Sequence, residues 1–348
     1  MLLIFSLGSV GLFMIVAEGL FRIVGVSSKP DNLYFLLNPE LDYPQFFKRD
    51  HKLFWKFWPN QVIQSNFMVA GEYRINSFGL RNKEFSLEKP KDAFRIVCLG
   101  NSNTFGWKQN EENAYPRQLQ RLFDRNLPGQ KIEVINAGIT GYSSYQGKIF
   151  LRKDILGFKP DLVLVNYGWN DLLPAKFGIP DKEQKMPPQW ILNIQNFLSR
   201  TRLYQLLKSF WVGRFSGKRG VEPGISRVSL EDFQQNLIEI EQICQKNKIP
   251  AVFLTNPVAS LEAYWGPGKV SKVHLINQAY NDAIRQLGQT HNFKVIDIAA
   301  LFEKRKDLYD HPQADYIHYN ALGHKLVART LYDYLLSREL ITTSAHQF

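Results

Sequence analysis

Cysteine is scarce in this sequence, with only Cys98 and Cys244 among 348 residues. Two cysteines in a chain of this length do not supply a disulfide framework, and they lack the paired spacing of a zinc site. Cys98 stands in an apolar run, so we expect it to be packed in the core. The cysteine count thus excludes a small fold held together by disulfides. It does not show whether the protein lies in an oxidising or a reducing compartment.

Blocks of lysine and arginine are also missing, although basic residues outnumber acidic ones and give a formal net charge of +11. Neither zinc-finger spacing nor the aromatic motif of RNA-binding domains is present. We therefore expect no nucleic-acid partner, and the charge fits an anionic membrane or an acidic polymer better. With 45% hydrophobic and 22% charged residues, the composition is that of a globular protein with a sizeable core.

A long apolar run stands at the N-terminus, where residues 2–24 carry no charge before Glu18. About 20 apolar residues are enough for a helix to cross a bilayer. Glu18 and Arg22 can pair on one face of such a helix. Residues 1–26 are therefore predicted to be an uncleaved, single-pass transmembrane anchor. A cleaved signal peptide and a buried helix are the alternatives, but a signal peptide would need a basic n-region and a small-residue cleavage site.

The charges around this run give little information about membrane orientation. No lysine or arginine precedes the run, whereas Arg22 lies near its end and Lys29 follows it. By the positive-inside rule this weakly favours a cytoplasmic domain. The residue pattern alone therefore leaves the side of the membrane open.

Residues 27–92 are predicted to be a linker and a small N-terminal extension. Aromatic residues and prolines crowd residues 27–60, which favours an irregular segment. Residues 72–82 mix polar and apolar positions around Asn76 and Gly79, which predicts a short hairpin. The polar residues 88–92 mark the end of this region.

Residues 93–340 are predicted to form the main domain, in which short apolar runs alternate with segments of helical length. The predicted strands are residues 95–99, 132–135, 162–165, 251–254 and 295–298, and the predicted helices are residues 115–126, 144–156, 230–247, 273–291 and 322–336. This alternation predicts an α/β fold with a parallel sheet and helices on both faces. In such sheets the ligand binds at the carboxyl ends of the strands.

An insertion at about residues 173–227 interrupts the alternation. Within it, residues 190–215 carry apolar side chains with basic residues between them, namely Arg200, Arg202, Lys208 and Arg214. A basic amphipathic helix can lie on a membrane surface. It can equally cover or pack on the domain, and both interpretations stay open.

A serine follows the first predicted strand. Gly100, Asn101 and Ser102 stand where this strand ends, so Ser102 is placed to attack a ligand at that edge. The next glycine is Gly106, four residues after the serine, which excludes the Gly-x-Ser-x-Gly nucleophile elbow. Taken alone, a turn serine that caps the next helix is the simpler interpretation.

Glycine and asparagine follow the next two predicted strands. Gly138 comes after the second strand, and its N–H can approach a ligand closely because glycine has no Cβ. Asn170 comes after the third strand, and its amide can donate a hydrogen bond to a developing oxyanion. The alternatives are a simple turn glycine and a helix-capping asparagine.

An aspartate and a histidine, Asp315 and His318, stand three residues apart near the C-terminus. On one face of a turn, the aspartate can hold the imidazole in the tautomer that a general base needs. His324 follows within the last predicted helix, where we expect it to pack or to lie on the surface. Asp310 and His311 could complete a metal site, but the spacing fits no familiar ligand set, so no metal is predicted.

Four short motifs occur in order: GNSNTFG at 100–106, NAG at 136–138, GWND at 168–171 and DYIH at 315–318. Together they supply a nucleophile, oxyanion donors, a base and its orienting group, which is the inventory for acyl transfer without a cofactor. With these motifs the chain resembles the SGNH/GDSL hydrolase superfamily from about residue 94 to 336. The resemblance implies a three-layer α/β/α sandwich with a flavodoxin-like parallel sheet.

The resemblance also implies a role for each site residue. Ser102 would be the nucleophile, His318 the general base and Asp315 its partner. The backbone N–H of Ser102, together with Gly138 and Asn170, would form the oxyanion hole. Asn101 departs from the family pattern, which usually has an aspartate before the serine. Asparagine keeps an acceptor oxygen there but loses the charge.

A further segment, NSFGLRNKEF at 76–85, resembles one found upstream of the catalytic domain in membrane-anchored members. Those members usually face away from the cytoplasm, which favours an extracytoplasmic location. The function expected from the sequence is a Ser-His-Asp hydrolase of carboxylic esters, acting on a small molecule or on an acylated glycan or lipid. An O-acyltransferase with the same triad and an inactive glycan-binding homologue are the alternatives.

Overall fold

The computed structural model describes residues 2–25, 46–64, 72–175, 178–207, 224–259, 272–310 and 315–341. The chain folds as two compact units. The first comprises residues 1–58 and 185–222, and the second comprises residues 59–184 and 223–348. The predicted boundary at residue 92 lies inside the second unit, and most of the predicted insertion belongs to the first.

The first unit begins with helix α1 (Leu2–Ile23). Glu18 and Arg22 form the expected ion pair, with 2.8 Å between Oε1 and Nε. Glu18 also accepts a hydrogen bond from the backbone N–H of Leu203. In the part of the chain that the structure describes, no helix has both the length and the apolar character that a membrane crossing needs. The transmembrane element of the predicted fold is therefore not found there.

A hairpin follows in the first unit, where β1 (Phe47–Asp50) pairs with β2 (Phe54–Phe57) in antiparallel register. Helix α6 (Gln189–Ser199) packs on β1. The Asn196 side chain accepts from the Arg49 N–H at 2.7 Å and donates to the Arg49 carbonyl at 3.0 Å. The prediction that residues 27–60 are irregular was thus wrong for residues 47–57, because their aromatic side chains are buried and Phe47 stacks on Phe57 across the two strands.

The predicted amphipathic helix over residues 190–215 is interrupted. Helix α6 ends at Ser199, and Arg200 is its C-cap residue. Residues 202–207 are helical again, whereas Lys208 and Arg214 lie outside the described residues. The membrane-surface and covering interpretations of this segment both stay predictions.

The second unit contains a five-stranded sheet in the order β6-β5-β7-β8-β9. Its strands are β5 (Ala93–Gly100), β6 (Lys131–Gly138), β7 (Leu162–Asn166), β8 (Ala251–Leu254) and β9 (Lys294–Ile296). Every neighbouring pair in this sheet is parallel. The prediction of an α/β fold with a parallel sheet is therefore confirmed.

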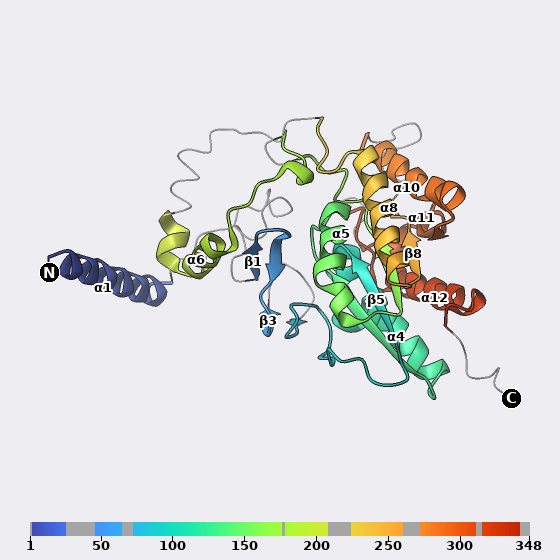
Figure 1. Cartoon of the computed structure of the whole chain (residues 1–348), viewed down its shortest axis with the longest axis horizontal. Helices are drawn as coiled ribbons and strands as arrows, with labels where there is room; N and C mark the ends of the chain where they lie inside the picture. The colour runs from blue at the N-terminus through green and yellow to red at the C-terminus, as the bar shows by residue number, and fades with distance from the viewer. Residues whose placement is uncertain are drawn as a thin grey trace. The chain divides into compact units, whose positions relative to one another are not determined.

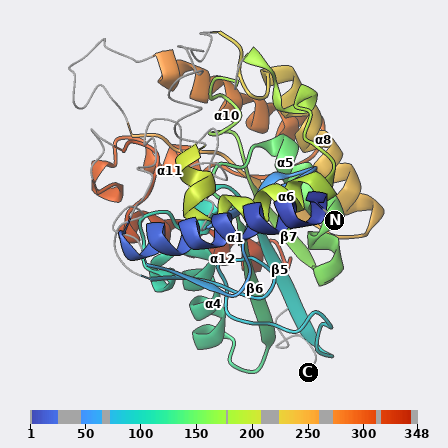
Figure 2. The ribbon, with the colours of Figure 1, turned by 90° about the vertical axis from the view of Figure 1, so that its left-hand side faces the viewer.

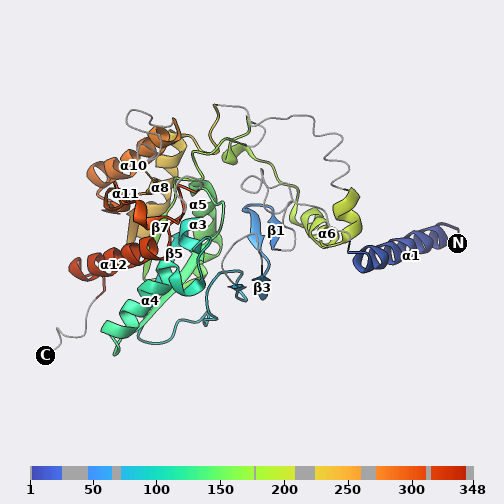
Figure 3. The ribbon, with the colours of Figure 1, turned by 180° about the vertical axis from the view of Figure 1, so that it is seen from behind.

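Helices cover both faces of this sheet (Figure 1). On one face, α4 (Tyr115–Asn126) and α12 (Ala321–Ser337) lie side by side (Figures 1 and 3). On the other, α5 (Ser144–Lys153) and α8 (Leu230–Lys246) lie side by side (Figures 1 and 2), and α10 (Lys272–Thr290) packs on α8. The shorter helices are α3 (Ser102–Phe105), α11 (Ile298–Phe302), and the 3₁₀ turns η1 (Glu111–Asn113), η2 (Ile155–Phe158), η4 (Asp181–Glu183) and η5 (Lys306–Leu308).

The core between the sheet and the α4–α12 layer is built from the apolar face of each element. Ile96 and Cys98 of β5 pack with Leu119 and Phe123 of α4 and with Leu331 of α12. All five side chains are fully or almost fully buried, which confirms the core position expected for Cys98. Burial of each large apolar side chain contributes about 1.5–3 kcal/mol to stability.

One predicted element was wrong and another ends earlier than predicted, in each case because a side chain bonds to the nearby backbone. Strand β4 (Glu72–Ile75) pairs with β3 (Gln61–Gln64) and not within residues 72–82. There the Asn76 carboxamide oxygen accepts from the N–H groups of Phe78 and Leu80, which closes a tight turn. The last predicted strand, 295–298, ends at Ile296 because Asp297 caps α11.

Candidate active site

The turn between β5 and α3 carries Ser102 at the carboxyl end of a central strand. Asn101 is the N-cap of α3, and its carboxamide oxygen accepts a hydrogen bond from the Asn103 N–H at 3.0 Å. Gly100 is required here, because a Cβ at this position would collide with the Thr104 side chain. Asn101 therefore keeps the helix-capping contact that needs an acceptor oxygen but no charge. Ser102 is the first helical residue and is 4% exposed.

Ser102, His318 and Asp315 form a chain of hydrogen bonds. The His318 Nε2 lies 2.9 Å from the Ser102 Oγ, although the two residues are 216 positions apart. The His318 Nδ1 lies 2.9 Å from each carboxylate oxygen of Asp315. Asp315 also accepts from the backbone N–H of His318 at 3.2 Å. The structure thus brings the three predicted residues together in the arrangement in which a base can activate a serine.

Asp315 also pairs with a lysine that was not among the site residues predicted from the sequence. The Lys108 Nζ lies 2.7 Å from the Asp315 Oδ2. Burial would raise the pKa of Asp315, but the hydrogen bond and charge of His318, together with Lys108, outweigh it and hold that pKa well below its ordinary value. Asp315 is therefore a carboxylate at neutral pH. No motif spacing indicates Lys108, because it reaches Asp315 only through the fold.

A buried arginine holds the turn that follows α3. The Arg81 guanidinium donates to the carbonyl oxygens of Phe105 at 3.0 Å, Gly106 at 2.7 Å and Gln109 at 2.6 Å. It also stacks on the Tyr73 ring, with 4.2 Å between Cζ and the ring centroid. Burial lowers the pKa of Arg81 to about 10, so it remains a cation at neutral pH. The segment at 76–85, noted in the sequence only for its resemblance, thus supports the nucleophile turn.

Gly138 has a packing role in the structure. Its N–H donates to the Asn136 carboxamide oxygen at 3.0 Å. A Cβ at Gly138 would collide with the backbone of Phe105 in α3, so glycine is needed for β6 and α3 to approach each other. Because its N–H already has an acceptor, the oxyanion role of Gly138 stays a prediction that this geometry does not favour.

A second glycine, Gly141, lies in the loop between β6 and α5. Its φ is +80°, and among the described residues its N–H has no acceptor. The neighbouring Tyr142 carbonyl accepts a hydrogen bond from the Asn170 side-chain amide at 2.9 Å. Sequence reasoning missed Gly141, since the NAGITG segment offers two glycines and nothing in it shows which one keeps a free N–H.

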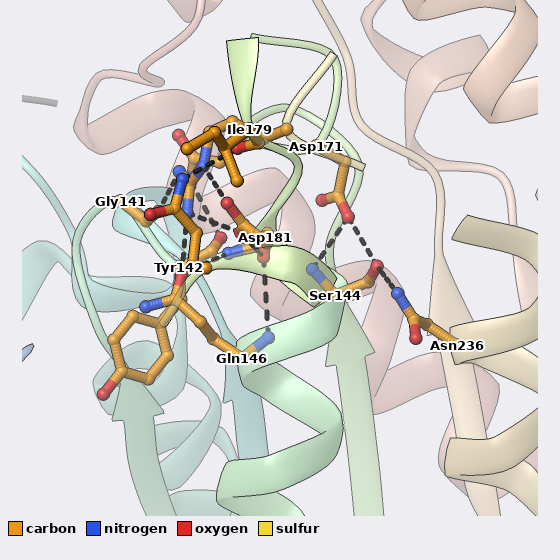
Figure 4. Close-up of polar contacts among 12 residues, drawn as sticks. Gly141, Tyr142, Ser144, Gln146, Asp171, Ile179, Asp181 and Asn236 are labelled. Carbon is orange, nitrogen blue, oxygen red and sulfur yellow. Dashed lines mark hydrogen bonds and ion pairs between the residues drawn. The ribbon is translucent and has the colours of Figure 1, made fainter. Parts of the chain in front are cut away.

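The loop after β7, which carries Asn170, is tied to the start of α5 by a buried carboxylate (Figure 4). Asp171 accepts from the N–H groups of Ser144 at 2.8 Å and Gly168 at 3.1 Å. Burial raises the pKa of Asp171 to about 6, against the lowering effect of the hydrogen bonds from Ser144. Asn170, which is 1% exposed, therefore lies on a loop that the Asp171 carboxylate binds both at Gly168 and at the start of α5.

His324 is a structural residue, as expected. It is 1% exposed, and its Nδ1 accepts a hydrogen bond from the Tyr115 N–H at the start of α4. Burial lowers the pKa of His324 to about 3, so its ring is neutral at physiological pH. Of the alternative metal ligands, His311 lies outside the described residues. Within the described ranges, no three His, Cys, Asp or Glu side chains gather as a metal site.

Comparison with known proteins gives a match to a family model and a match to a curated relative. The model, described as the GDSL-like lipase/acylhydrolase family, matches residues 98–326. Over 100 residues the chain is 35% identical to an acetylxylan esterase of Xylanibacter ruminicola, and this match covers 26% of the chain and 20% of that protein. The chain therefore spans about a fifth of the length of this relative.

Solved structures with a similar backbone include an acetyl xylan esterase and a lipase/acylhydrolase. A crystal structure of an acetyl xylan esterase, AlAXEase, has a TM-score of 0.46 and 18% identity, and the match covers 70% of this chain and 100% of that one. The lipase/acylhydrolase from Enterococcus faecalis has a TM-score of 0.45 and 19% identity, with 70% and 96% covered.

The family match extends over well more than half of the chain. It begins within β5, just before Ser102, and ends within α12, after the Asp315–His318 pair. The chain therefore belongs to the GDSL-like lipase/acylhydrolase family.

Proposed function

We propose that the protein cleaves carboxylic esters through Ser102, with His318 as the general base and Asp315 as the group that orients it. The observation that carries this proposal is the unbroken chain of 2.9 Å contacts from the Ser102 Oγ through the His318 ring to the Asp315 carboxylate. Asp315 accepts at Nδ1, which leaves Nε2 as the nitrogen that can take a proton from the serine.

The reaction then has two balanced halves. The Ser102 Oγ attacks the acyl carbon while His318 takes its proton, and the resulting imidazolium protonates the leaving alcohol. Water attacks the acyl-serine in the second half, again with His318 as base, and the carboxylic acid and the free serine are regenerated. The Asp315 carboxylate stabilises the imidazolium in both halves.

We assign the oxyanion hole to the backbone N–H of Ser102, the N–H of Gly141 and the Asn170 amide. Among the described residues, neither backbone N–H has a hydrogen-bond acceptor. The Asn170 amide uses one of its two hydrogens on the Tyr142 carbonyl and retains the other. Gly141 replaces Gly138 in this assignment because the Gly138 N–H is bound to Asn136.

Replacing Asn170 by alanine is expected to lower kcat for p-nitrophenyl acetate by about 10²–10³-fold, the usual cost of one oxyanion donor. The change in KM should be small, because the donor acts on charge that develops only in the transition state. Asn281→Ala is the matched control, since Asn281 is a buried asparagine that bonds the backbone of Asn256. A normal kcat in Asn170→Ala, or an equal loss in both variants, would remove Asn170 from the hole.

We propose an acetylated glycan as the substrate class. The name of the curated relative, an acetylxylan esterase, supports this choice. Aromatic side chains also line the surroundings of the base: the Trp107 ring centroid is 5.9 Å from that of His318, and Trp169 contacts Tyr316 edge-on. Trp107 and Trp169 are buried, whereas Tyr316 is half-buried, so of these three rings Tyr316 leaves the most surface for contact with a sugar.

Acetate release from acetylated xylan, compared with hydrolysis of p-nitrophenyl esters of two to twelve carbons, tests this substrate class. We expect acetate from the polysaccharide and a preference for the acetyl ester over long chains. A preference for long-chain esters, without acetate release from xylan, would instead indicate a lipid ester. Formation of an acetylated sugar from p-nitrophenyl acetate and added xylooligosaccharide would identify the transferase alternative.

The location of the protein is no part of this functional proposal. Attachment to a membrane and an extracytoplasmic site both stay predictions from the sequence and the resemblance. Esterase chemistry at Ser102 does not depend on either.

A further inference from the structure

A buried ion pair in the second unit joins Asp181 and Arg227, which stand in the sequence on either side of residues 185–222. The Arg227 Nε and Nη2 donate to the two carboxylate oxygens of Asp181 at 3.1 and 2.9 Å. Both side chains are 5% exposed. Backbone hydrogen bonds continue the closure, from the Asp181 N–H to the Arg227 carbonyl and from the Arg227 N–H to the Leu173 carbonyl. The chain segments that lead into and out of residues 185–222 are thus joined at this point.

The same guanidinium also binds the loop between β6 and α5. The Arg227 Nη1 donates to the Gly141 carbonyl at 2.7 Å, and Nη2 donates to the Gln146 side-chain oxygen at 2.8 Å. The Asp181 Oδ2 accepts from the Ser143 hydroxyl at 2.6 Å. Figure 4 shows Gly141, Gln146 and Asp181 gathered at the amino-terminal end of α5. The ion pair therefore holds the loop carbonyl and the N-cap of α5 together.

The residues held in this way flank the proposed oxyanion donors. Gly141 has a φ of +80°, which glycine adopts without strain because it has no Cβ. The bond from Arg227 to its carbonyl fixes the peptide that joins Gly141 to Tyr142. The Tyr142 carbonyl in turn receives the Asn170 amide. A change in this peptide would therefore move both the Gly141 N–H and the partner that orients Asn170.

We propose that Arg227 is a positioning residue for the oxyanion hole, acting through the Gly141 carbonyl and paired with Asp181. It contacts no substrate, and its contribution is to keep the donors aligned before the reaction begins. This inference rests on the proposed function, because it assigns a role toward the oxyanion that forms at Ser102. A displacement of about 1 Å at a reacting centre lowers the rate by about 10²-fold, which sets the scale of the effect.

The test uses two full-length variants, because removal of a buried arginine leaves Asp181 without its charge partner and weakens the fold. Arg227→Lys keeps the charge, but a single ammonium has no planar fork with which to bind the carboxylate, the Gly141 carbonyl and Gln146 together. The double variant Arg227→Met with Asp181→Asn removes both charges. We expect both variants to fold, with kcat for p-nitrophenyl acetate about 10- to 100-fold lower and KM within about 3-fold of wild type.

A boronic acid that forms a tetrahedral adduct with the serine gives the second measurement. Its inhibition constant should rise by the same factor as kcat falls, since it requires the oxyanion hole, whereas a purely structural role of Arg227 would change the melting temperature alone. Arg95→Met is the matched control: Arg95 is fully buried, pairs with Glu133 and binds the Phe158 carbonyl. This control should lower the melting temperature and leave kcat unchanged.

Wild type and Ser102→Ala are measured in the same assays, so that failure of the positioning role of Arg227 can be distinguished from failure of the proposed function. Folded Arg227 variants with wild-type kcat and wild-type boronic acid affinity would overturn the positioning role. A loss of kcat in Arg95→Met equal to that in the Arg227 variants would also overturn it. If wild type does not hydrolyse the ester, or if Ser102→Ala retains activity, the proposed function itself fails.

Discussion

Replacing Ser102 by alanine is expected to lower the hydrolysis of p-nitrophenyl acetate by at least about 10⁴-fold, because it removes the atom that forms the acyl bond. The side chain is small, and α3 keeps the cap that Asn101 provides. We therefore expect the variant to fold with a melting temperature close to that of wild type. Initial rates at saturating ester, together with thermal unfolding, measure both quantities.

The matched control for this variant is Ser229→Ala. Ser229 caps α8 through its hydroxyl, which accepts from the Asp232 N–H at 3.1 Å. Its removal should cost about 1 kcal/mol of stability and leave kcat unchanged. If Ser102→Ala retained more than a few per cent of the wild-type rate, the nucleophile would have to be another group.

Replacing Asp315 by asparagine is expected to lower kcat by about 10³–10⁴-fold. The asparagine amide would face the His318 Nδ1 and donate to it, which moves the ring proton to Nε2. In that tautomer Nε2 can no longer accept the proton of Ser102. The Lys108 ammonium, 2.7 Å from Oδ2, would also lose its charged partner. The steady-state kcat for p-nitrophenyl acetate measures the loss.

The effect of Asp315 on stability has a defined sign. Its folded-state pKa lies below the ordinary value, so the ionised group stabilises the fold above about pH 4, and this contribution is lost as the pH falls further.

For the loss of kcat in Asp315→Asn, the matched control is Asp297→Asn, since Asp297 pairs with Arg285 and caps α11. It should lower stability and leave kcat unchanged. An Asp315→Asn variant with normal kcat would show that His318 needs no carboxylate.

The secondary structure of the main domain was largely predictable because its signal is local. The apolar runs at 162–165 and 251–254 match β7 and β8 to within one residue, and the predicted helix 115–126 is α4. Elements that depend on side-chain caps were not predictable in this way. Asn76 and Asp297 redirect the chain through hydrogen bonds from nearby backbone N–H groups to their side chains, which a hydrophobic pattern does not register.

The candidate site was predictable in part for a related reason. Because carboxyl ends of parallel strands share one edge of a sheet, Ser102 and Asn170 could be expected there from strand assignment alone. The residues that support the site could not. Lys108, Arg81 and Arg227 act through contacts between segments far apart in the sequence, and their spacing carries no pattern.

Covalent labelling with a fluorophosphonate, followed by mass spectrometry of the digested protein, tests the central claim about Ser102 most directly. The reagent phosphonylates a serine that a neighbouring base activates, so wild type should carry one adduct, on the peptide that contains Ser102. Ser102→Ala should carry none, and Asp315→Asn should react much more slowly. An adduct on a different residue, or equal labelling of wild type and Ser102→Ala, would contradict the assignment of Ser102 as the nucleophile.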